Sequence, residues 1–63
     1  MRPNGAPAKA LLDLLSKQGE GLVKHDSARR RLLHLGYIRD LGGWMCRLTL
    51  EGIVVARALK ASA

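Results

Sequence analysis

The chain has 63 residues, a single cysteine, and 11 Lys and Arg against 5 Asp and Glu, which gives a formal net charge of +6 at pH 7. A chain of this length forms one domain at most, close to the lower size limit for a fold held by its own core. One cysteine excludes an intramolecular disulfide and a multi-cysteine zinc site. The excess of positive charge favours a polyanionic partner, the alternative being charge that serves solubility alone.

The N-terminal third of the chain predicts an arm and then a helix. Residues 1–6 (Met-Arg-Pro-Asn-Gly-Ala) contain turn-forming residues and no apolar pattern, so we expect a disordered arm there. Pro7 suits the first position of a helix, and 7–63 are expected to form a single domain. Apolar residues recur at helical spacing from Ala8 onward, which predicts a helix over 8–18 that glycines then end.

A second helix is expected over 27–35, after a short stretch at 21–26 that favours either an extended piece or one irregular turn. Asp26 or Ser27 is expected to cap this helix, because short polar side chains accept hydrogen bonds from the free amides of a first turn. Gly36 is expected to end the helix in the left-handed conformation.

The apolar and polar residues of this helix separate into two faces, because successive side chains are rotated by about 100°. The face expected to be buried contains Ala28, Leu32 and Leu35. The residues expected on the outward face are Ser27, Arg30, Arg31 and His34, with Arg29 and Leu33 at the flank. The arginines are therefore expected on the outer side of a helix that is anchored in the core.

The residues after this helix predict a β-hairpin. Strands are expected over 37–41 and 44–48, because both stretches favour β structure and Gly42-Gly43 between them is typical of a two-residue hairpin turn. Alternation along the second strand predicts a buried face made of Trp44, Cys46 and Leu48.

A last helix is expected over 50–61. Thr49 is a good N-cap and Glu51 suits the first turn, where the helix dipole favours an anion. Apolar residues surround more than half of this helix, which is more than one small core needs. We therefore expect a second copy of the chain to cover part of it, in a homodimer whose interface contains Ile53, Val55 and Leu59.

The order of these elements resembles the winged helix-turn-helix of small bacterial and phage transcription regulators. The resemblance is carried by 35–38 (Leu-Gly-Tyr-Ile), like the leucine-glycine step that ends the family's recognition helix, and by 48–52 (Leu-Thr-Leu-Glu-Gly), like the segment that follows its wing. It covers more than half of the chain, from Ser27 onward, and implies an α+β fold with three helices and a two-stranded β-hairpin wing. The family has a complete helix where this chain has only 21–26, so that helix is expected to be a single turn or the motif an abbreviated one.

The resemblance implies a DNA-binding surface made of the second helix (27–35) and the wing (37–48). The helix would face a major groove, where arginine pairs with guanine or with phosphate, and the wing arginines would lie near backbone phosphates. The residues implied for DNA binding are Ser27, Arg29, Arg30, Arg31, His34, Arg39 and Arg47.

Several of these side chains also fit roles that involve no ligand. His34 fits a solvent-facing residue, and at least one of the three consecutive arginines fits a stem that covers apolar surface. Trp44, beside the hairpin turn, could stack on a sugar or a base, but an aromatic packed beneath the hairpin is the commoner arrangement. Cys46 is expected to be a small core residue. No nucleophile–base set, phosphate loop or metal-ligand spacing is visible, so we expect no enzyme, metal or cofactor. No apolar run is long enough for a signal peptide or a membrane span, so the cytoplasm of a bacterium or of an infected host cell is the expected location.

Charge and resemblance together favour a small basic protein that binds double-stranded DNA as a transcription regulator or accessory factor. The alternative is a winged-helix interaction module or inhibitor, for example phage-encoded, that acts on a larger protein assembly such as RNA polymerase. The clustered arginines favour DNA, whereas the shortened motif and the broad apolar last helix favour a protein partner. RNA ranks third, because one Trp and one Tyr offer little stacking on single strands.

Overall fold

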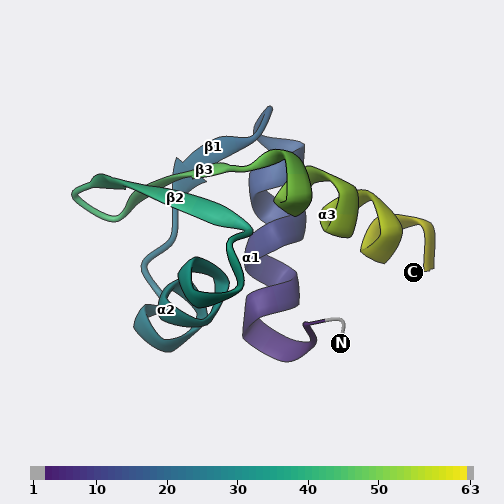
Figure 1. The fold of residues 1–63 in the computed structure, drawn as a ribbon, viewed down its shortest axis with the longest axis horizontal. Coiled ribbons are helices and arrows are strands. Elements are labelled where there is room, and N and C mark those ends of the chain that lie inside the picture. The colour runs from purple at the N-terminus through teal and green to yellow at the C-terminus, as the bar shows by residue number, and fades with distance from the viewer. Residues whose placement is uncertain (1–2, 63) are drawn as a thin grey trace.

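Three helices and three strands make up the structure, a computed structural model that describes residues 3–62 (Figure 1). The order along the chain is α1 (Gly5–Ser16), β1 (Glu20–Leu22), α2 (Asp26–Leu35), β2 (Ile38–Gly42), β3 (Met45–Leu48) and α3 (Leu50–Ser62). The strands form one antiparallel sheet in the order β1-β3-β2. The chain is therefore an α+β domain, as expected, but its sheet has three strands rather than two.

The added strand comes from the stretch for which an extended piece and an irregular turn were both expected. Its residues pair with β3 in the register Glu20↔Arg47, Gly21↔Cys46 and Leu22↔Met45. Residues 23–25 then lead into α2 without any helical residue. The extended alternative is thus confirmed, and no helical turn lies between α1 and α2.

Helix α1 begins earlier and ends earlier than the spacing of its apolar residues predicted. Gly5 and Ala6 belong to the helix and not to the expected arm, and residues 1 and 2 of that arm lie outside the described part. Pro7 is the third helical residue and not the first, a position whose N–H would have no partner inside the helix in any case. The backbone N–H of Gly19 closes the other end by donating to the carbonyl of Leu14 at 2.7 Å.

The hairpin turn lies one residue later than predicted. Gly43 and Trp44 occupy the two turn positions with φ of 56° and 66°, the positive pair that a type I′ turn requires. The register shifts between Asp40 and Gly42, so that Leu41 is an extra residue in β2. This bulge moves Trp44 out of the strand, and the prediction that Trp44 is buried is wrong, because the residue is 54% exposed.

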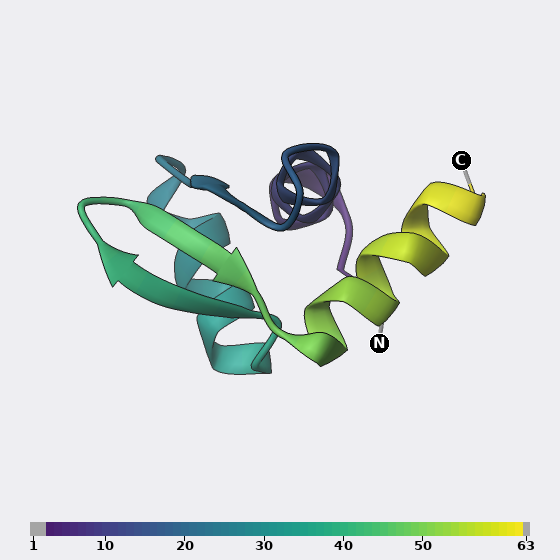
Figure 2. The same ribbon diagram turned by 90° about the horizontal axis from the view of Figure 1, so that it is seen from above.

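The core lies between the inner face of the sheet and the three helices, with α1 at its centre (Figure 1). Seen from above, the hairpin and α3 extend to opposite sides of α1 (Figure 2). The buried apolar residues are Leu11, Leu14, Val23, Ala28, Leu32, Ile38, Cys46, Leu48 and Ala56. Ala28 and Leu32 of α2 and Cys46 and Leu48 of β3 are buried as expected, whereas Leu35, also expected on the buried face of α2, is only partly buried.

Helix α3 begins at the cap that the sequence predicted. The Thr49 hydroxyl accepts from the backbone N–H of Gly52 at 3.0 Å and donates to the carbonyl of Gly36 at 2.7 Å. The cap therefore also attaches α3 to the end of α2. No helix of the described residues is long and apolar enough to cross a membrane.

Candidate nucleic-acid interface

Helix α2 starts at a cap that the sequence did not indicate. The Nδ1 atom of His25 accepts from the backbone N–H of Ala28 at 3.2 Å, and the Ser27 hydroxyl lies 3.2 Å from the same nitrogen. The prediction of Asp26 or Ser27 as the cap is wrong, because an imidazole nitrogen supplies the acceptor that short polar side chains usually provide. Asp26 is instead the first helical residue, where a negative charge favours the helix dipole.

Arg29 is separated from the other arginines by its contacts. Its side chain is only 15% exposed, Nη1 donates to the carbonyl of Val23 at 3.2 Å, and Nη2 pairs with the carboxylate of Asp26. These bonds hold α2 against the connector that follows β1. The sequence resemblance implied that Arg29 contacts DNA, whereas in the structure its side chain is bonded within the domain.

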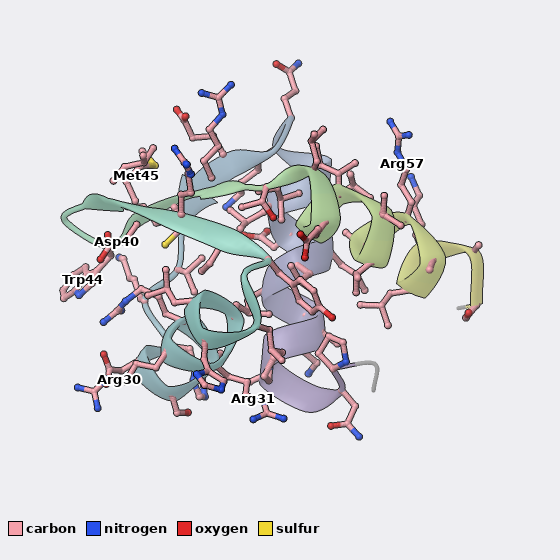
Figure 3. The ribbon with its side chains drawn as sticks, in the orientation of Figure 1. Arg30, Arg31, Asp40, Trp44, Met45 and Arg57 are labelled. Carbon is pink, nitrogen blue, oxygen red and sulfur yellow. The ribbon has the colours of Figure 1, made fainter. Side chains whose placement is uncertain are left out.

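The other residues expected on the outward face of α2 are exposed together. Arg30 is 77% exposed and its Nε lies 3.1 Å from a carboxylate oxygen of Asp26. Arg31 is exposed and forms no ion pair with any residue of 3–62. Both point away from the sheet in Figure 3. With Ser27 and His34, which are also exposed, they form a row at i, i+3, i+4 and i+7, which we call the α2 row.

The two arginines of the hairpin lie on the opposite side of the molecule. Arg39 and Arg47 are paired in register across β2 and β3, and Glu20 pairs with Arg47 on the other side. Ile38 and Leu48 alternate with them and are buried against the helices, so Arg39 and Arg47 face outward from the sheet. Figure 3 supports this placement, since Met45, which shares the face of Arg47, points away from α2.

The structure therefore divides the predicted DNA-binding residues into three groups. The α2 row is one continuous surface, Arg29 is a tie between elements, and Arg39 with Arg47 forms a basic pair on the outer face of the sheet. The sequence pattern placed each residue on its own element correctly but contained no information about how the two elements face each other.

An exposed aromatic side chain, which the sequence reading assigned to the core, lies at the tip of the hairpin. Trp44 points from the turn toward the side of the sheet on which α2 lies, as does Asp40 (Figure 3). The signal that was missed is the bulge at Leu41, which depends on pairing between strands and has no local marker.

A separate apolar surface lies on α3. Leu50 is 83% exposed and Val54 is 68% exposed, and with Tyr37, Glu51 and Val55 they line a shallow hollow of about 370 Å³. Ile53, Val55 and Leu59, the residues expected in a dimer interface, are partly buried against the core of their own chain. Part of the apolar surface of α3 is thus covered inside the domain.

In comparisons with known proteins, no family model, no curated protein and no solved structure matches this chain. The fold and the surfaces by themselves define a class: a small basic α+β domain with three helices, a three-stranded antiparallel sheet and an exposed row of cationic side chains on one helix.

Proposed function

We propose that this protein is a small DNA-binding domain with a winged-helix-like arrangement, a transcription regulator or accessory factor that places α2 against the major groove of a duplex. The observation that carries the proposal is the α2 row. Four polar or cationic side chains share one exposed face, while Ala28 and Leu32 anchor the opposite face in the core. A helix of this kind fits a major groove, and its arginines suit phosphate oxygens and guanine edges.

The proposal differs in two respects from the one that the sequence resemblance implied. The contact is made by one helix, because residues 23–25 join β1 to α2 without a preceding helix. Arg39 and Arg47 are assigned no role on that duplex. In Figure 1 the sheet and α2 lie apart along the vertical direction, in which the molecule extends 21 Å. This exceeds the Debye length of about 10 Å at 0.1 M salt, so charges on the far face are largely screened from DNA bound at α2.

Two double variants of equal charge test the assignment. Arg30→Ala/Arg31→Ala removes two exposed charges from the α2 row, and Arg39→Ala/Arg47→Ala removes two exposed charges from the sheet. In a titration of labelled random duplex DNA over a range of salt, we expect the first to lower affinity by about tenfold or more. It should also reduce the slope of log K against log salt by about 2, since each lost phosphate contact contributes roughly 0.9. The second variant should change both quantities far less.

Equal losses in the two variants would contradict this assignment and leave only net charge as the source of binding. Circular dichroism of both variants serves as the folding control, since all four side chains are exposed.

The alternative function, binding to a larger protein assembly, is favoured by the exposed pair Leu50 and Val54 beside Tyr37. An apolar pair on one helix face, with polar residues around it, is typical of protein contact sites. Failure of the wild-type domain to bind duplex DNA even at low salt would replace the DNA proposal with this one.

A further inference from the structure

Trp44 occupies a backbone position that is unfavourable for its residue type. Its φ of 66° lies in the left-handed region, which glycine and asparagine tolerate and which a bulky side chain rarely adopts. A strained residue of this kind persists only where the surrounding structure holds it, and such positions gather at binding sites.

Hydrogen bonds on both sides hold the hairpin tip, which we define as residues 41–44. The carbonyl of Trp44 accepts from the backbone N–H of Val23 at 2.8 Å, so the connector after β1 fixes the turn. On β2, the carboxylate of Asp40 accepts from the backbone N–H of Gly42 at 2.8 Å. The indole is thus attached to a braced turn.

The strain at Trp44 is not offset by burial of its ring. Trp44 is 54% exposed, and Leu41 beside it at the tip is 51% exposed. The core cluster contains neither residue. A large aromatic ring is therefore presented to the surroundings from a braced support, on the side of the sheet where α2 lies (Figure 3).

We propose that Trp44 stacks on an unpaired base of DNA that is held by the α2 row, so that the preferred ligand is a duplex interrupted by an unpaired base. The inference rests on the proposed function. Stacking of one base on an aromatic ring gains about as much free energy as opening one step of a continuous duplex costs. Because the domain has a single ring at the tip, a base that is already unstacked gives a net gain and an intact duplex gives almost none.

The test uses two DNA probes with the same ends, a fully paired duplex and the same duplex with one extra unpaired adenine at its centre. Trp44 is the only tryptophan of the chain, so intrinsic tryptophan fluorescence reports on this ring alone. We expect the bulged probe to quench the fluorescence and to bind about tenfold more tightly than the paired probe, within the range that one stacked base provides.

Two variants separate the ring from the tip. Trp44→Gly removes the ring and places at φ of 66° the residue that best tolerates it, so the fold should be retained. Leu41→Ala removes an exposed apolar side chain from the same tip and is the matched control. The preference for the bulged probe should disappear in Trp44→Gly with unchanged affinity for the paired probe, whereas Leu41→Ala should keep it.

The possible outcomes test the stacking of Trp44 separately from the proposed DNA binding on which it rests. Equal binding of both probes without quenching, combined with the expected loss in Arg30→Ala/Arg31→Ala, would overturn the stacking inference and leave the DNA-binding proposal standing. Absence of binding to either probe would overturn both. A Trp44→Gly variant that keeps the preference would assign the unpaired base to another residue and would also overturn the inference.

Discussion

At the scale of a single residue, the threonine and the glycine that lie three positions apart at the start of α3 each have a structural reason. A Cβ at Gly52 would lie 1.9 Å from the carbonyl oxygen of Tyr37, which is much shorter than a van der Waals contact distance. The Thr49 hydroxyl caps the same turn through the Gly52 N–H. The spacing therefore combines a cap with a close approach between α3 and the residue before β2.

We predict that Gly52→Ala strongly destabilises the domain. Helix propensity alone favours alanine by about 1 kcal/mol, so the sign of the change tests the clash directly. The added methyl group would clash with backbone atoms, which cannot easily move aside. A destabilisation above about 4 kcal/mol would remove much of the free energy of unfolding, roughly 3–9 kcal/mol, expected for a domain of this length. Urea unfolding followed by circular dichroism measures the change.

Gly36→Ala is the matched control, because Gly36 has φ of 77° but open space around its Cβ position. It should cost only about 1–2 kcal/mol, the price of a left-handed alanine. A Gly52→Ala variant that is as stable as wild type would show that α3 and Tyr37 do not pack as described.

At the scale of the element, helix α3 has one apolar side that packs against the core and another that faces outward. Ile53 packs against the core cluster, whereas its neighbour Val54 is largely exposed. The apolar pattern of the sequence is nearly continuous through this region and does not separate the two sides. The pattern therefore could not show that the residues expected in a dimer interface also pack partly against the core of their own chain.

We predict unequal effects for truncation of these two neighbours. Ile53→Ala should lower the free energy of unfolding by about 1–3 kcal/mol, below the full range for buried isoleucine because the side chain is only partly buried. Val54→Ala should change it by less than about 0.5 kcal/mol. Thermal unfolding measured at two protein concentrations checks the values and detects self-association. Similar losses for both variants that grow with protein concentration would favour a dimer through this helix.

At the scale of the whole molecule, Cys46 joins the sheet to the helices. Its side chain is fully buried on the inner face of β3. Burial raises the pKa of this thiol, the nearby carboxylate of Asp40 raises it further, and the guanidinium of Arg29 opposes the rise. The folded domain therefore keeps the thiol protonated at pH values where an unfolded chain loses the proton.

We predict that this thiol makes the domain less stable in alkali. Its pKa is higher in the folded state than the ordinary value of 9.0, so its contribution is fully present below pH 9 and is lost as the pH rises through the folded pKa. Urea unfolding between neutral pH and the alkaline range measures the decline. Cys46→Ala should reduce the slope above pH 9, and an unchanged slope in that variant would assign the decline to other groups.

The sequence by itself determined the features that depend on neighbours within a few residues. The outward row on α2, the left-handed stop at Gly36 and the cap at Thr49 follow from helical periodicity and from local hydrogen bonding, so they could be predicted. The α2 row is the part of the candidate site that was predictable for this reason.

Only the tertiary structure decided how these elements face one another. The pairing of β1 with β3 joins residues more than twenty positions apart, and the bulge at Leu41 that exposes Trp44 exists only once β2 and β3 are in register. The packing of Arg29 and the position of Arg39 and Arg47 on the far face likewise depend on which sides of α2 and the sheet meet in the core. Local propensity determines the direction of a side chain relative to its own helix or strand, whereas its direction relative to the rest of the molecule follows from the burial of apolar side chains shared between distant segments.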